Sequence, residues 1–254
     1  MVRSVLRLDG GHLQLILDQP KSNIISRAMI GDLTAALAAV PRTSSIRLVT
    51  IEGAGDHFSY GASIEEHQPA HIAEVLPALH ALVRELLAVP APTAAIVRGR
   101  CLGGGFEVAL ACDLIFASAT AVMGIPEITL GVFPPAAAAL LPLKIGSSRA
   151  AGAILTGQAH PMAHWVQAGL VELTAPAQEL QAAVDHWFQI HLAALSAAAL
   201  QCAAFATRVG MRKHVDAVLP ELERYYLDTL MGTQDAVEGI TSFIEKRAPV
   251  WRHA

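Results

Sequence analysis

The spacing of apolar residues predicts strands in the first half of the chain and helices throughout. Apolar residues alternate with polar ones, or form short β-branched runs, in four segments that we predict as strands: residues 13–17, 46–52, 94–98 and 114–117. Two intervening segments, residues 26–39 and 70–88, have helical spacing. Ser26 suits a helix N-cap, and Pro77 is expected to break or kink the second helix.

The second half of the chain is expected to contain helices only. After a helix at residues 106–112, helical spacing continues at residues 136–144, 147–155, 161–168, 178–209, 216–230 and 234–246. Strands that alternate with helices, followed by helices alone, predict the α/β class. We place the β/α core in residues 1–195 and a helical C-terminal region in residues 196–254.

Composition narrows the class of protein. The chain has 254 residues, of which 53% are hydrophobic and 16% charged, which favours one large core and argues against disorder. The net charge of −4 and the lack of a Lys/Arg run argue against nucleic acid as a partner. The most apolar stretch, residues 134–142, is too short to cross a membrane. Three cysteines without C-x-x-C spacing indicate reduced thiols and a cytoplasmic location, and the scattered histidines give no metal site.

The clearest candidate chemistry lies where three glycines precede an acid. Gly103, Gly104 and Gly105 are followed by Phe106 and Glu107 inside an apolar helical run. Glycines allow the backbone to approach a ligand closely, and the first amides of a helix are free to point at it. No cationic residue lies three or four positions from Glu107 to pair with it. This pattern suits stabilisation of an oxyanion next to a proton-transfer group.

Four segments in order resemble one known family. Residues 58–63 (F-S-Y-G-A-S) resemble its F-x-A-G-A-D, and residues 99–113 (G-R-C-L-G-G-G-F-E-V-A-L-A-C-D) resemble its G-x-x-x-G-G-G-x-E-L-A-x-x-C-D. Residues 123–127 (M-G-I-P-E), then Leu130 and Gly131, resemble its F-x-x-P-E-x-x-L-G, and residues 243–247 (F-I-E-K-R) its F-x-E-K-R. Over nearly its full length the chain resembles the crotonase (enoyl-CoA hydratase/isomerase) superfamily.

This resemblance implies a fold, a substrate class and a site. The implied fold is a spiral of ββα units with an α-helical C-terminal trimerisation region, usually assembled as a dimer of trimers. The implied substrate is a coenzyme A thioester, so coenzyme A is part of the substrate and no separate cofactor is expected. The amides of Ala62 and Gly104 correspond to the oxyanion hole. Coenzyme A contacts are implied for Lys21, Ser22, Ile24, Ala62 and Ile64 and, from a neighbouring subunit, for Phe243 and Lys246.

Two glutamates correspond to the family's acid positions, and both are present here as Glu107 and Glu127. The pair favours a hydratase, a hydro-lyase in which one carboxylate takes a proton from water and the other carboxyl gives one to carbon. Their pKa values must differ for this division of roles, and close carboxyls push each other's pKa values apart. The sequence leaves open which glutamate is the base. Asp113 is expected to have a structural role.

Departures from the common pattern indicate an unusual acyl group. Ser63 replaces an aspartate, residues 61–69 read G-A-S-I-E-E-H-Q-P, and residues 131–142 read G-V-F-P-P-A-A-A-A-L-L-P instead of a glycine-rich turn. The last two features resemble the branch that hydrates cyclohexa-1,5-diene-1-carbonyl-CoA to 6-hydroxycyclohex-1-ene-1-carbonyl-CoA, a step in aromatic degradation. The alternatives are a straight-chain enoyl-CoA hydratase, an isomerase or thioester hydrolase, and a non-catalytic protein of this fold that binds acyl-CoA or RNA.

Overall fold

The computed structural model describes residues 1–19 and 22–254, and Lys21 therefore lies outside the described residues. Its main sheet has the strand order β1-β2-β3-β4-β6-β9. The strands are β1 (Val2–Arg7), β2 (His12–Leu17), β3 (Leu48–Gly53), β4 (Thr93–Val97), β6 (Leu114–Ser118) and β9 (Leu173–Ala175). β1 pairs antiparallel with β2, and the other neighbouring strands of this sheet are parallel.

A smaller sheet is formed by β5 (Arg100–Leu102), β7 (Val122–Gly124) and β8 (Ala159–Pro161). The helices in the described part of the chain include α1 (Arg27–Ala38), α2 (Ile72–Ala88), α3 (Gly104–Leu110), α4 (Pro135–Ile145), α5 (Ser147–Thr156), α6 (Met162–Gln167), α7 (Leu180–His191), α8 (Ala197–Arg224) and α9 (Gln234–Ile244). Short helical turns occur at η1 (Glu65–His67), η2 (Pro126–Leu130), the π-helical η3 (Tyr225–Thr229) and η4 (Leu230–Gly232).

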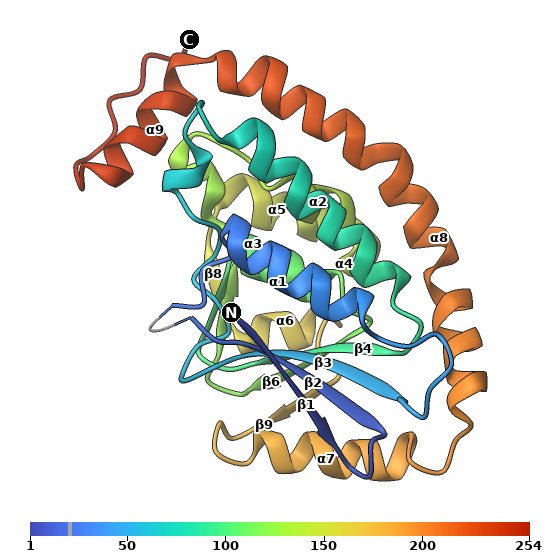
Figure 1. Cartoon of the computed structure of the whole chain (residues 1–254). Coiled ribbons are helices and arrows are strands. Elements are labelled where there is room, and N and C mark those ends of the chain that lie inside the picture. Colours follow the sequence, from blue (N-terminus) through green and yellow to red (C-terminus); the bar gives the residue numbers. More distant parts are fainter. Residues whose placement is uncertain (20–21) are drawn as a thin grey trace.

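The main sheet lies between two layers of helices, as Figure 1 shows. Successive strand residues point to opposite faces. Leu48 of β3 packs in the cluster that contains α7, whereas Val49 packs on the other face with α1, α2 and α3. Likewise, Ala94 of β4 packs in the cluster with α7, and Ala95 packs on the opposite face. Because both faces are covered, β3 and β4 are buried throughout and rich in apolar residues, as is usual for parallel sheets, with Thr50, Glu52 and Thr93 as buried polar exceptions.

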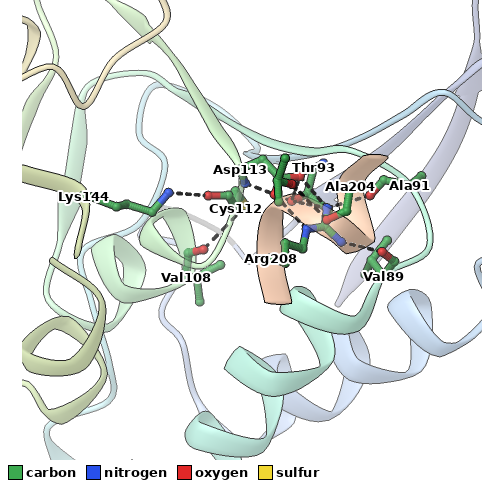
Figure 2. A network of polar contacts seen from close by, with 10 residues as sticks. Val89, Ala91, Thr93, Val108, Cys112, Asp113, Lys144, Ala204 and Arg208 are labelled. Carbon is green, nitrogen blue, oxygen red and sulfur yellow. Dashed lines mark hydrogen bonds and ion pairs between the residues drawn. The ribbon is translucent and has the colours of Figure 1, made fainter. Parts of the chain in front are cut away.

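A buried ion pair joins α8 to the core (Figure 2). The Arg208 guanidinium is 3% exposed. Its Nε donates to Asp113 Oδ1 at 2.7 Å, and it also donates to the carbonyl oxygens of Val89 and Ala91. Asp113 additionally accepts from the Thr93 amide at 2.7 Å. The structural role expected for Asp113 is confirmed.

The structure confirms the α/β class and the helical C-terminal region, with corrections to individual elements. Ser26 does cap α1, since its side chain accepts from the Met29 amide. Pro77 does not break α2. It has no N–H to donate to the Ala73 carbonyl, but Ala73 is exposed, so water can bind that carbonyl instead. The expectation of helices alone in the second half was wrong, because β8 and β9 are short strands there. The single helix expected at residues 178–209 is two helices, α7 and α8.

Candidate active site

Gly103 forms the turn between β5 and α3, and Gly104 and Gly105 are the first two residues of α3. Gly103 has a φ of +47°, a conformation that residues with side chains rarely adopt. A Cβ atom at Gly103 would lie 2.6 Å from Oε1 of Glu127, so only glycine leaves room for that carboxyl group. The turn thus places the Glu127 carboxyl beside the start of α3, the helix that carries Glu107.

The Ala62 loop lies against this same turn. Ser59 accepts a hydrogen bond from the Leu102 amide at 3.0 Å, which holds residues 58–62 beside β5. A Cβ atom at Gly104 would lie 3.1 Å from the Ala62 Cβ and 3.2 Å from the Ala62 nitrogen. Within residues 1–19 and 22–254, neither the Ala62 nor the Gly104 amide donates to another backbone group. The two amides predicted from the sequence are therefore neighbours and are free to bind an oxygen.

Glu107 is buried in α3 and is held by a second helix. Its side chain is 3% exposed. Oε1 accepts a hydrogen bond of 2.9 Å from the Ala137 amide in the first turn of α4, and the Ala136 amide contributes a second. Burial raises the pKa of Glu107, and the two amides partly oppose this by stabilising the ionised form.

Glu127 has a less favourable environment for a charge. Oε2 of Glu127 is buried without a hydrogen-bond partner in the described part of the chain. Burial raises the pKa of Glu127, and the nearby charge of Glu107 raises it further. The two carboxyls therefore interact, and the environment favours the protonated form of Glu127 over that of Glu107. This asymmetry is what a pair with one acid and one base requires.

A cavity of about 510 Å³ opens onto this site. It is lined by both apolar and polar residues, namely Ile24, Tyr60, Gly61, Ala62, Ser63, Ile64, Glu65, His67, Leu102, Gly103, Pro126, Glu127, Thr129, Leu130, Val132, Ile240 and Phe243. Gly104 and Glu107 are buried and are not among these lining residues, whereas Glu127 is.

The residues proposed for coenzyme A divide into two groups. Ile24, Ala62, Ile64 and Phe243 line the cavity together. Ser22 lies next to it, since its carbonyl accepts from the Tyr60 amide at 3.0 Å. Lys246 is exposed just beyond α9 and is not part of the lining. Phe243 lines the cavity of its own chain, and its expected contact with coenzyme A from a neighbouring subunit stays a prediction.

The turn that carries Glu127 is held by the C-terminal helix α9. A Cβ atom at Gly239 of α9 would collide with the Leu130 carbonyl oxygen at the end of η2. At Gly131, with a φ of +71°, a Cβ atom would lie 2.8 Å from the Asp235 carbonyl oxygen. The backbones of α9 and η2 are therefore in direct contact, so the position of Glu127 depends on a helix more than a hundred residues later in the chain.

Sequence reasoning missed one buried phenol in the C-terminal region. Tyr226 in η3 is 1% exposed, and the charges of Glu127 and Glu107 both bear on its phenol. Its partners are distant in sequence, and the pair Tyr225-Tyr226 is indistinguishable from an ordinary helix segment. The available signal was only that the chain's three tyrosines include two adjacent ones in its helical C-terminal region.

Comparison with known proteins places this site in a family. A profile of the family described as enoyl-CoA hydratase/isomerase matches residues 9–254. The chain belongs to the enoyl-CoA hydratase/isomerase family. It is 42% identical to cyclohexa-1,5-dienecarbonyl-CoA hydratase of Thauera aromatica, over 98% of this chain and 95% of that protein. It is 33% identical to 2,3-dehydroadipyl-CoA hydratase of Escherichia coli, over 93% of each chain.

A solved structure extends the likeness to the fold. The enoyl-CoA hydratase from Mycobacterium avium subsp. paratuberculosis superimposes with a TM-score of 0.86 at 29% identity, covering 98% of both chains. The crotonase-like fold is thereby confirmed, and the chain is a hydro-lyase of the enoyl-CoA hydratase type. An acyl-CoA substrate is consistent with this family. No helix in the described residues is long and apolar enough to cross a membrane, and these residues contain no group of three or more candidate metal ligands.

Proposed function

We propose that this enzyme adds water to cyclohexa-1,5-diene-1-carbonyl-CoA and forms 6-hydroxycyclohex-1-ene-1-carbonyl-CoA. The observation that carries the proposal is the pair of unequal carboxyls, Glu107 and Glu127, beside the adjacent free amides of Ala62 and Gly104. The ring substrate is supported by the 42% identity to a hydratase named for that substrate.

The first step uses Glu107 as the base. The amides of Ala136 and Ala137 at the start of α4 favour its ionised form, so it takes a proton from water. The oxygen of that water forms a bond to the carbon β to the thioester. The negative charge passes to the thioester oxygen, where the amides of Ala62 and Gly104 stabilise it.

The second step uses Glu127 as the acid. Its raised pKa keeps a proton on the carboxyl near neutral pH. In the ring substrate the charge of the dienolate extends to the far end of the second double bond. Protonation there leaves the remaining double bond conjugated to the thioester, which is a 1,4-addition. Glu127 lines the cavity in which the ring would lie, next to Leu130 and Val132.

The departures in residues 131–142 have a physical role in this proposal. Pro134 and Pro135 begin α4, and Pro135 stands at a first-turn position where the missing amide proton costs nothing. The alanines that follow present the two amides to Glu107. Val132 lines the cavity, and Phe133 packs beside Tyr226 behind it. This segment both tunes the base and forms an apolar wall for the acyl group.

Coenzyme A is proposed to lie along Ser22, Ile24, Ala62, Ile64 and Phe243, with Lys21 and Lys246 near its phosphates. We also propose assembly as a trimer or a dimer of trimers. Association is supported by large apolar side chains left exposed on α5, α7 and α8, among them Leu155, Ile190 and Phe205.

The substrate proposal is tested by comparing kcat/KM of the purified enzyme for the cyclic dienoyl-CoA and for crotonyl-CoA. A clear preference for the cyclic compound is expected. A preference for crotonyl-CoA would reject the ring substrate and favour the straight-chain enoyl-CoA hydratase, which the 33% identity to 2,3-dehydroadipyl-CoA hydratase supports as the second candidate.

A further inference from the structure

The turn that carries Glu127 borders two hollows. Glu127 and Val132 line the substrate cavity, and Thr129 lines it as well. Ile128, Thr129 and Gly131 line a second hollow of about 680 Å³, whose other walls are residues 249–254 and the start of α9. We call this second space the outer hollow. Because Thr129 lines both spaces, the support that the turn receives from the outer hollow depends on the side chains that cross it.

Trp251 is the side chain that reaches the turn from the outer hollow. A Cβ atom at Gly131 would lie 3.2 Å from Cζ3 of Trp251, so the indole packs against this backbone. Gly131 ends η2 in the left-handed conformation, with a φ of +71°. Just beyond it, the Val132 amide donates to the Glu127 carbonyl at 3.3 Å. This bond closes the turn from Glu127 to Val132, so a shift of Gly131 is passed on to Glu127.

The backbone on both sides of Trp251 is tied to α9. The residue before it, Val250, donates its amide to Oε1 of Glu238 at 2.7 Å. The residue after it, Arg252, donates its amide to Oδ1 of Asp235 at 2.6 Å. Both carboxylates belong to α9, the helix whose backbone also contacts η2. The position of the indole is therefore set by the helix that supports the turn, although Trp251 itself is 37% exposed.

We propose that Trp251 is a positioning residue for hydration, whose ring stops the Glu127 turn from moving into the outer hollow and so holds the carboxyl at the substrate. Trp251 is not among the residues that line the substrate cavity, so it acts through the turn. A misplacement of about 1 Å caused far from the reacting atoms can cost about 100-fold in rate. The proposal rests on hydration with Glu127 as the acid, but not on the ring substrate.

The test compares Trp251→Ala with Trp251→Phe, which keeps an aromatic ring, and with the matched control Val250→Ala. Val250 is the preceding residue, is 58% exposed and does not line the outer hollow. Its tie to α9 uses the backbone amide, which alanine retains. For each protein we would measure kcat on whichever of the cyclic dienoyl-CoA and crotonyl-CoA the wild type hydrates. Thermal stability and the affinity for butyryl-CoA, a saturated analogue, would be measured beside it.

A loss in kcat without a loss in binding is expected. Trp251→Ala should lower kcat about 10- to 100-fold and keep the affinity for butyryl-CoA within about twofold, because a displaced acid affects the reaction more than the fit of the ligand. Trp251→Phe should recover most of that loss, and Val250→Ala should behave as the wild type. Asp235→Asn, which removes one acceptor of the segment that carries Trp251, should lower kcat in the same direction.

Two results would overturn the proposal. One is a kcat of Trp251→Ala within about twofold of the wild type. The other is a joint fall of kcat, butyryl-CoA affinity and thermal stability, which would assign Trp251 to folding alone. If Trp251→Ala does not fold, Asp235→Asn decides: a lower kcat with butyryl-CoA affinity kept supports the role, and a wild-type kcat rejects it.

The same measurements separate this proposal from the proposed substrate. A wild type that hydrates crotonyl-CoA and not the ring rejects the ring substrate alone, and the Trp251 comparison is then decided on crotonyl-CoA. A wild type that hydrates neither compound overturns the proposed function, and the positioning role falls with it.

Discussion

The Ala137 amide donates a hydrogen bond of 2.9 Å to Oε1 of Glu107, so the carboxyl of one helix caps the start of another. This contact gives Glu107 a stabilised charge that Glu127 lacks. The difference arises from backbone amides, since no cationic side chain in the described residues pairs with either carboxyl.

Replacing either acid by its amide is expected to stop hydration. Glu107→Gln and Glu127→Gln each remove one proton-transfer group, and each should lower kcat by at least about 100-fold. Glu179→Gln, at an exposed position before α7, is the matched control and should keep full activity. Steady-state rates with the preferred enoyl-CoA check this. A one-base isomerase would instead tolerate one of the two changes.

The stability of the protein is expected to depend on pH through Glu127. Its folded pKa is raised, so the unfolded chain loses this proton at a lower pH than the folded protein. Stability therefore falls as pH rises from the ordinary glutamate pKa through the raised one. Glu127→Gln should stabilise the enzyme at pH 8 by about 1–3 kcal/mol and have almost no effect at pH 4. Denaturation at both pH values measures this, and equal effects at both would contradict it.

Gly103→Ala is expected to displace Glu127. The new methyl group would lie 2.6 Å from its Oε1, and the residue would keep a positive φ. We expect a loss of about 1–3 kcal/mol in stability and at least about 100-fold in kcat. Gly55→Ala is the matched control, because Gly55 also has a positive φ of +77° but has open space around it. Its activity should be unchanged, and a similar loss of activity in both variants would show that backbone strain alone is responsible.

Removing the buried cation of Figure 2 is expected to destabilise the fold without altering the chemistry. Arg208→Met leaves Asp113 without its ion pair and should cost about 3–5 kcal/mol in the free energy of unfolding. Arg3→Met breaks an exposed pair with Asp18 and should cost less than about 1 kcal/mol. Urea denaturation compares the two. An Arg208→Met protein as stable as Arg3→Met would contradict the assigned role.

The sequence predicted the parts of this site that depend on local residue types. The glycine turn, the amides of Ala62 and Gly104, and both glutamates occur within recognisable segments, and the structure brings those segments together. The roles of these residues and of the proposed coenzyme A contacts stay predictions. The short strands β5, β7 and β8 were missed because three residues are too few to show a periodicity.

Contacts between distant segments could not be read from the chain. The alanine-rich stretch at residues 136–139 predicts a helix, but nothing in it indicates that its first amides bind Glu107. The break between α7 and α8 follows no glycine or proline, and its local signal is Ser196, whose side chain accepts from the Ala199 amide and caps α8. Tyr226 packs against Val132 and Ile240 because α8, which precedes it, crosses the molecule beside α2 and α4 (Figure 1).

The seating of Gly239 on Leu130 has a consequence for recombining this enzyme with its relatives. Any chimera joined between positions 131 and 234 would inherit the acid-bearing turn from one parent and its supporting backbone from the other. A parent with a larger residue at 239 would then push on the turn from outside, even if every residue around the substrate were retained. The turn η2 and the helix α9 should therefore come from the same parent, because they are in contact although they are far apart in the sequence.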